Sequence, residues 1–224
     1  MSTPPHSPAD APGDKPVGVA DPVWIDDLPL FPLGTVLFPG GVLPLRVFET
    51  RYMDMVRACM HTGSPFGVCL ITDGKEVGDT PSHESIGCLA SILDWDMEQL
   101  GLLRIRASGG RRFEVQERRV QRDGLLRARV RLLGPDPDLA VPQDFEILPQ
   151  LVRRIVSDLV EQEENPQNRM VAEPYDFDSA TWVSNRLCEF LPIPMKARQK
   201  LMELDEPLTR LSLVRQFLEQ RQVI

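Results

Sequence analysis

The chain has 224 residues, of which 42% are hydrophobic and 26% are charged, and its formal net charge is −8 at pH 7. This composition is typical of a globular protein and excludes a mainly disordered chain or an integral membrane protein. The longest uncharged run, residues 28–45, is shorter than the roughly 20 residues of a membrane-spanning helix and contains several prolines and glycines. A chain of this length can bury one large core or two modest ones, and we expect two domains.

Residues 1–25 are rich in proline, aspartate, alanine and glycine and contain few large apolar side chains. Such a segment buries too little apolar surface to offset the entropy cost of ordering, so we predict a disordered tail. The segment has neither the basic start nor the apolar centre of a signal peptide, which predicts a cytoplasmic protein.

The range 26–135 consists of short apolar segments separated by turn signals, a pattern typical of β-strands. The predicted strands span residues 28–33, 42–48, 66–72, 86–95, 101–108, 111–120 and 125–133. One helix is predicted over residues 49–60, because apolar side chains recur there at helical spacing. These side chains belong to Tyr52, Met55, Val56 and Cys59. Closely spaced short strands favour a barrel, and the helix would cross one of its open ends.

Prolines recur in the first two predicted strands and in the turn between them. They are Pro29, Pro32, Pro39 and Pro44. Proline is tolerated at strand starts, on edge strands and at bulges, so these positions predict repeated bending at the rim of the barrel. The motif "FPGG" at residues 38–41 predicts a turn in which one of its two glycines adopts a positive φ.

After residue 135 the apolar pattern changes from the period of a strand to that of a helix. The predicted helices span residues 144–164, 178–191, 194–204 and 206–221, and Pro192 ends the second of them. Amphipathic helices joined mostly by short loops predict a helical bundle over residues 136–224.

The four cysteines are Cys59, Cys69, Cys88 and Cys188. They form no CxxC pair, and two of them lie within apolar segments, so we predict buried free thiols. No residues have the spacing of metal ligands, and we expect no metal site.

Four motifs occur in a specific order along the chain. They are "LPLFPLGTVLFPGGVLPLRVFETRY" at 28–52, "IGCLASI" at 86–92, "GGRRFEV" at 109–115 and "LCEFLPIPMKARQKLMELDEPLTRLSLVRQFL" at 187–218. In this order they resemble the N-terminal, substrate-binding domain of Lon proteases and of stand-alone Lon-domain proteins, and more distantly cereblon. The resemblance implies an α+β fold: an N-terminal PUA-like β pseudobarrel with one crossing helix, followed by a C-terminal helical bundle.

The resemblance also implies a function without catalysis. In Lon this domain helps to recruit unfolded or tagged polypeptides, whereas ATP hydrolysis and peptide cleavage belong to later domains. The nearest candidate for a phosphate-binding loop, "GVCLITDGKE", has the wrong glycine spacing and ends in glutamate, and the Ser-Lys protease signature is absent. Ser82, His83 and Glu84 are the residue types of a hydrolytic triad, but as sequence neighbours they predict a turn.

We therefore expect no catalytic residues and no cofactor. The favoured hypothesis is a polypeptide-binding module that acts as an adaptor in protein quality control. Its partners would be unfolded or extended polypeptide segments, with a protease or an ATPase as a further candidate partner. Glu49, at the start of the predicted helix, is interpreted as a capping or ion-pairing residue rather than as a contact for a partner.

The segment "LDWDMEQLG" at residues 93–101 predicts a hairpin tip with apolar side chains on an acidic loop. Trp95, Met97 and Leu100 are the candidate polypeptide-binding residues, because an aromatic ring and flexible apolar side chains can hold apolar residues of a partner. Ordinary packing is the alternative interpretation of these residues.

Ten arginines lie within residues 104–131, and PUA-like folds include RNA-binding domains. The alternative function is therefore RNA binding through arginines of the predicted strands: Arg104, Arg106, Arg127, Arg129 and Arg131. Arginine alternates there with apolar residues, however, which is also typical of the solvated face of a half-buried strand. Phe113 is the sole aromatic residue in the block, so a stacking surface for bases is missing and nucleic acid is the less favoured partner.

Overall fold

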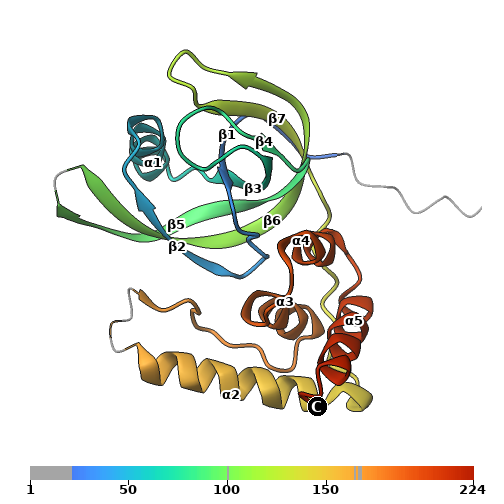
Figure 1. The fold of residues 1–224 in the computed structure, drawn as a ribbon. Helices are drawn as coiled ribbons and strands as arrows, with labels where there is room; N and C mark the ends of the chain where they lie inside the picture. Colours follow the sequence, from blue (N-terminus) through green and yellow to red (C-terminus); the bar gives the residue numbers. More distant parts are fainter. Residues whose placement is uncertain (1–21, 100, 164, 166–167) are drawn as a thin grey trace, which may run out of the picture.

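The computed structural model describes residues 22–99, 101–163, 165 and 168–224 (Figure 1). The strands are β1 Trp24–Leu33, β2 Val42–Val47, β3 Phe66–Asp73, β4 Ser82–His83, β5 Ile86–Gln99, β6 Leu102–Val120 and β7 Leu126–Leu132. The helices are α1 Thr50–Thr62, a short 3-10 turn η1 Gln143–Phe145, α2 Ile147–Gln162, α3 Ala180–Phe190, α4 Met195–Glu203 and α5 Pro207–Gln220. Within this part of the chain, no helix has both the length and the apolar character that crossing a bilayer requires.

The strands form one mostly antiparallel seven-stranded sheet with the neighbour order β1-β7-β6-β5-β3-β4. An additional parallel pairing of β1 with β3 joins strands from distant places in this order, so the sheet curls back on itself (Figure 1). Strand β2 pairs with β6 alone among the described strands. One edge of β2 is consequently left without a neighbouring strand.

Strand β6 is a single strand of 19 residues where the sequence predicted two. Its first part pairs with β2, its last part pairs with β7, and β5 runs along it for most of its length. Gly109 and Gly110, which suggested a break, lie inside the strand. The prediction of two strands was wrong because Gly109 serves a close backbone approach rather than a turn: a Cβ there would lie 2.0 Å from the carbonyl oxygen of Phe38.

Strand β1 accommodates its prolines by changing partners. Its residues up to Leu30 pair with β7, and those from Leu30 onward pair with β3. Pro29 and Pro32 each face one partner strand only, so neither needs a second ladder donor. The predicted bends rested on this property, that proline is tolerated where its nitrogen has no partner strand to bond.

Strand β1 begins at Trp24, inside the range 1–25 that was predicted as a tail. Trp24 pairs with Arg131 of β7, and the Arg129 guanidinium lies 4.7 Å from the centre of its ring. These contacts give the last residues of that range a place in the sheet. Residues 1–21 lie outside the described part of the chain.

Helix α1 covers one end of the curled sheet with the apolar face that the sequence predicted (Figure 1). The four side chains predicted to face inward, Tyr52, Met55, Val56 and Cys59, are all buried. All four cysteines of the chain are buried free thiols, as predicted, and burial raises the pKa of each. The segment of Ser82, His83 and Glu84, predicted as a turn, contains the short strand β4, and His83 Nδ1 lies 2.7 Å from the Glu84 carbonyl oxygen.

The helices α2 to α5 lie together on one side of the curled sheet (Figure 1). Their apolar faces share one core, to which the sheet half contributes Val36, Phe38 and Leu70. The sheet half, residues 22–132, and the helical half, which begins at residue 143, are therefore joined by a common hydrophobic core as well as by the connecting segment, residues 133–142.

The "FPGG" turn is held by polar side chains of α3. Arg186 donates to the carbonyl oxygens of Pro39, at 3.0 Å, and of Gly40, while Glu189 pairs with Arg186 at 3.1 Å and accepts from the Phe38 N–H at 3.3 Å. Gly40 has a φ of 72°, and a Cβ on Gly41 would lie 2.0 Å from the Glu189 carboxylate. The two glycines thus have different roles, one for backbone conformation and one for close packing.

From the mostly buried carboxyl group of Glu189 we predict a pH dependence of stability. Burial raises its pKa to about 7, although Arg186, the Phe38 N–H and Arg198 act to lower it. Because the folded chain binds this proton more tightly than the unfolded chain, the free energy of unfolding falls as the pH rises from about 5 to about 7.

In the variant Glu189→Gln we expect this fall to become shallower. Urea unfolding of both proteins between about pH 5 and pH 8 measures it, and the contribution of His83, whose pKa is lowered by burial, cancels in the comparison. Equal slopes in the two proteins would show that Glu189 does not titrate in this window.

Candidate functional site

A cavity of about 730 Å³ opens at the unpaired edge of β2. Its walls are residues 44–49 of β2 and the following loop, the end of β1, the start of α1, residues 76–77 after β3, the facing parts of β5 and β6, and Glu163, Asn165 and Asn168 after α2. We call this cavity the β2 groove. It lies where the sheet half faces a segment of the helical half, so both halves contribute to it.

One side of the β2 groove is apolar. Phe31 of β1 stacks on Tyr52 of α1 with ring centres 4.0 Å apart, and Leu33 and Val47 are buried beside them. Burial also raises the pKa of the Tyr52 hydroxyl, which keeps the ring neutral. At the rim, Phe48 is 54% exposed. Val77, another lining residue, is also 54% exposed, whereas Phe31 and Tyr52 are 5% and 4% exposed and belong to the core beneath the groove. Phe48 and Val77 are therefore the side chains that can contact apolar groups of a ligand.

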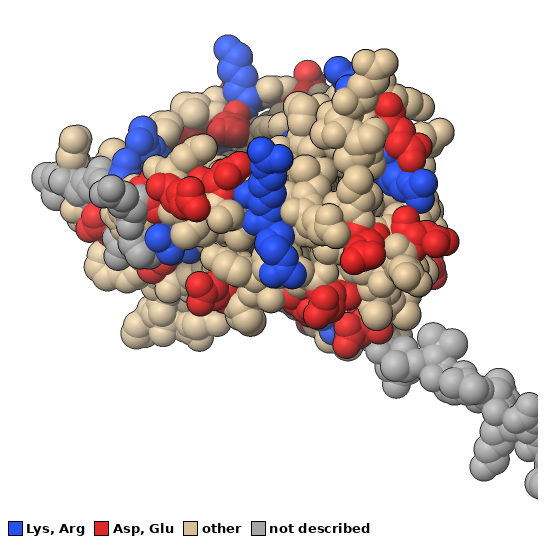
Figure 2. All heavy atoms as spheres, turned by 90° about the horizontal axis from the view of Figure 1, so that it is seen from below, with Lys and Arg blue, Asp and Glu red and all other residues tan. Residues whose placement is uncertain are grey.

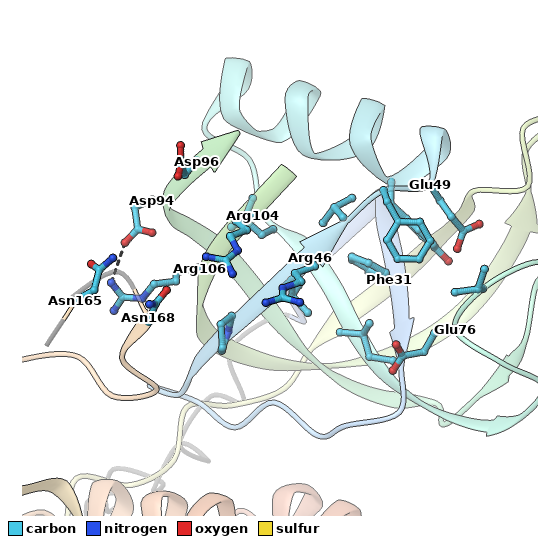
Figure 3. A pocket seen from close by; sticks show the side chains of 18 of the residues that line it. Phe31, Arg46, Glu49, Glu76, Asp94, Asp96, Arg104, Arg106, Asn165 and Asn168 are labelled. Carbon is cyan, nitrogen blue, oxygen red and sulfur yellow. Dashed lines mark hydrogen bonds and ion pairs between the residues drawn. The ribbon is translucent and has the colours of Figure 1, made fainter. Parts of the chain in front are cut away.

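The other side of the β2 groove carries arginines from two neighbouring strands. Arg46 of β2 lies opposite Arg104 of β6, and Figure 3 shows both side chains and Arg106 pointing into the groove. Arg106 pairs with Asp94 of β5 at 2.9 Å. Arg46 is exposed and makes no ion pair with any residue that the structure describes. Arg46 is thus a cation available to a ligand.

Two carboxylates at the opposite end of the groove are already engaged (Figure 3). Glu49 pairs with Arg51 at 2.8 Å, which is the ion pair expected at this helix start, although its side chain does not cap the helix. Glu76 accepts a hydrogen bond from the Gly34 N–H at 2.5 Å. Within the described residues there is no group of three or more histidine, cysteine or acidic side chains that could hold a metal ion.

Two of the polypeptide-binding residues predicted from sequence lie outside the β2 groove. Trp95 and Met97 are 52% and 40% exposed, on the face of β5 opposite to Asp94 and Asp96, which line the groove. They lie in β5, which continues to Gln99 and pairs there with Leu102 of β6, with register irregularities between Ile92 and Asp94 and between Asp96 and Gln99. The third predicted residue, Leu100, lies outside the described residues.

The arginines of the alternative RNA-binding hypothesis occupy two separate places. Arg104 and Arg106 line the β2 groove, whereas three others lie on β7. Arg127 pairs with Asp27 at 3.2 Å, Arg129 with Asp26 at 3.2 Å and Arg131 with Glu114 at 2.5 Å. Seen from the helical side, basic and acidic side chains are also interspersed over the surface (Figure 2). The basic block of the sequence therefore does not form one basic surface on β6 and β7.

The groove residues of β2 were not predicted from the sequence. The signal was present in "VLPLRVF", because Pro44 within an apolar strand indicates an edge strand and Arg46 follows on the same face. What the sequence could not show is that β1 and α1 leave this edge open.

Residues 27–220 match the protein family described as the ATP-dependent protease La (LON) substrate-binding domain. The chain belongs to this family. The β2 groove is accordingly a groove in a Lon substrate-binding domain, and the resemblance seen in the four sequence motifs is confirmed.

The chain is also similar to individual proteins of known name or structure. The chain is 26% identical to the Lon protease of Cytophaga hutchinsonii, and the match covers 86% of this chain and 24% of that protein. It is 30% identical to protein cereblon of Danio rerio, where the match covers 57% of this chain and 30% of that protein. The crystal structure of a Lon N-terminal domain protein from Xanthomonas campestris is 38% identical, with a TM-score of 0.67 over 85% of this chain and 97% of that one. The N-terminal domain of the Mycobacterium avium complex Lon protease, 14% identical with a TM-score of 0.53, shows the same fold.

Proposed function

We propose that this Lon substrate-binding domain is a non-catalytic module that captures unfolded or extended polypeptide segments in the β2 groove. It would serve as an adaptor in cytoplasmic protein quality control and pass its client to a protease or an ATPase. We also propose that residues 26–135 form a PUA-like pseudobarrel and that residues 136–224 form a helical bundle.

The combination of chemistries in the β2 groove carries this proposal. The exposed side chains of Phe48 and Val77 offer an apolar surface, Arg46 offers a cation, and the adjacent strand edge offers backbone groups. A polypeptide is a ligand that can use all three at once, whereas a small apolar ligand would leave the backbone groups and Arg46 unused. An affinity in the micromolar range, about −8 kcal/mol, would suit capture followed by handover.

The test is fluorescence anisotropy of the purified full chain against a labelled, reduced and carboxymethylated unfolded protein and against a labelled RNA oligomer, each at low and high salt. We expect saturable polypeptide binding that persists at high salt, because apolar burial is little affected by ionic strength. Phosphate contacts weaken steeply with salt. Salt-sensitive RNA binding in the absence of polypeptide binding would overturn the proposal.

A pair of variants locates the site in the same assay. Phe48→Ala removes an exposed ring at the rim of the β2 groove, and we expect it to weaken polypeptide binding about 5- to 10-fold, the effect of losing an interfacial aromatic residue. Trp95→Ala is the matched control, because it removes an equally exposed ring outside the groove. The reverse result would place the site on the β5 surface that the sequence predicted.

A further inference from the structure

The pairing of β2 with β6 shows to which edge of β2 each residue directs its backbone N–H and carbonyl groups. The Gly109 N–H donates to the Gly41 carbonyl oxygen at 2.8 Å, and the register continues from Val42 opposite Ser108 to Val47 opposite Leu103. Because backbone groups alternate between the two edges of a strand, the residues that bond to β6 are Leu43, Leu45 and Val47. The residues between them direct their backbone groups to the other edge.

Pro44 supports this alternation independently. Proline has no N–H to give to a ladder, so in an edge strand it belongs where the missing donor faces away from the neighbouring strand. The carbonyl of Pro44 and both the N–H and the carbonyl of Arg46 then face the β2 groove, where no strand of the described chain pairs with them. An exposed strand edge with such groups is a template for one more strand.

We propose that an extended peptide segment binds in the β2 groove by adding a strand to the open edge of β2. This inference rests on the proposed function and specifies how that function is carried out. Main-chain hydrogen bonds to Pro44 and Arg46 would supply affinity for any extended segment, and the two walls of the groove would select its side chains.

The walls define the chemistry of the peptide. Side chains of an added strand point alternately to its two faces. One set would meet the apolar side of the groove, where Val77 is 54% exposed and Leu45 is partly exposed, and the other set would meet Arg46, the exposed cation without an ion pair among the described residues. The preferred peptide therefore alternates apolar with polar residues and carries a carboxylate opposite Arg46.

The edge favours a peptide over a second copy of this chain. If two β2 strands paired with each other, each would present Pro44, and both partners would lack a donor at that position. Proline on an edge is a common protection against pairing between copies. A peptide without proline forgoes only the one hydrogen bond that Pro44 cannot donate.

Backbone methylation tests the added strand directly. The probe is a labelled octapeptide in which valine alternates with threonine and one central threonine is replaced by glutamate. Two derivatives are N-methylated on alternate amides, one on each of the two sets. If the peptide adds to β2, only the set facing β2 matters, so we expect one derivative to bind at least about 10-fold more weakly and the other to bind like the parent. Equal affinities would overturn strand addition.

Variants of Arg46 provide the second readout. Arg46→Ala removes the cation and should weaken binding of the glutamate peptide but not of a glutamine version. Arg46→Pro also removes the N–H that faces the groove, while the bonds of β2 to β6 are kept, so it should weaken both peptides about 5- to 10-fold further than Arg46→Ala. Similar binding by the two variants would contradict a role for the Arg46 N–H.

Failure of this inference is distinguishable from failure of the proposed function. Equal binding by the two methylated peptides together with persistent binding of the unfolded protein would refute strand addition and leave the proposed function standing. Loss of binding to both probes in the parent protein would refute both. A concentration-dependent dimer in sedimentation, abolished by Arg46→Pro but not by Arg46→Ala, would identify a second copy as the occupant and overturn the peptide.

Discussion

Replacing Asp136 by asparagine is expected to lower the free energy of unfolding by about 3 to 5 kcal/mol, the cost of removing one partner from a buried ion pair. Asp136 lies in the connecting segment, and its side chain is 3% exposed. One carboxylate oxygen pairs with Arg112 of β6 and the other with Arg210 of α5 at 3.0 Å. Neutralising Asp136 would leave two buried guanidinium groups without their common counter-charge.

Asp136, Arg112 and Arg210 form one buried charged cluster. Its further hydrogen bonds explain why the loss of stability should be large. Arg112 also donates to the carbonyl oxygens of Met202, at 3.3 Å, and Glu203, at 3.1 Å, at the end of α4. Arg210 donates to Asn185 of α3 at 2.6 Å. The cluster thus joins β6, the connecting segment and three helices, and its disruption affects the contact between the two halves of the chain.

Asp138→Asn is the matched control, because Asp138 is an exposed aspartate of the same segment. A surface substitution of this kind changes stability by less than about 0.5 kcal/mol. Chemical unfolding of both variants measures the difference. If Asp136→Asn were as stable as Asp138→Asn, the cluster would contribute nothing to the stability of the chain.

Replacing Gly109 by alanine is expected to destabilise the chain by about 3 kcal/mol, at the upper end of the usual cost of overpacking. The added Cβ would lie 2.0 Å from the Phe38 carbonyl oxygen, so the backbone itself would have to move. The same residue exchanges hydrogen bonds of 2.8 Å with Gly40 and Gly41, which fix the turn before β2.

Gly110→Ala provides the comparison within the same motif. Its Cβ would lie 3.4 Å from Leu89, an ordinary contact, and alanine is a better strand residue than glycine, so we expect a change of less than about 1 kcal/mol. Thermal and urea unfolding of the two variants measure the contrast. Equal stabilities would mean that the approach of Phe38 to β6 is not a constraint.

Elements with regular apolar periodicity could be predicted from the sequence because their own side chains decide them. Helix α1 is an example, since Tyr52, Met55, Val56 and Cys59 recur at helical spacing and are all buried, as are their neighbours Arg51 and Met53. The fact that residues 102–120 form one continuous strand, β6, could not be predicted in the same way. A glycine pair indicates flexibility in the sequence, and only the partner strand and the Phe38 carbonyl show that Gly109 is needed for close packing.

The arginines show why the candidate site, too, could not be predicted from the sequence alone. In the sequence, Arg112 belongs to an arginine block that alternates like a solvated strand face, yet its side chain is 2% exposed and paired with Asp136. Arg46 stands alone in an apolar segment, yet it faces the groove. Whether an arginine is a structural ion pair or a ligand contact depends on acidic partners far away in the sequence, and these are brought together only by the fold.

Residue-resolved amide signals of the full chain, recorded with and without the unfolded protein, show whether polypeptide binds in the β2 groove. We expect the ligand to shift the amide signals of Arg46 and Phe48 and to slow the hydrogen exchange of Arg46, whose N–H faces the open edge. Changes confined to residues 93–97 of β5 or to residues 127–131 of β7, with the signals of β2 unaltered, would place the polypeptide elsewhere and refute binding in the β2 groove.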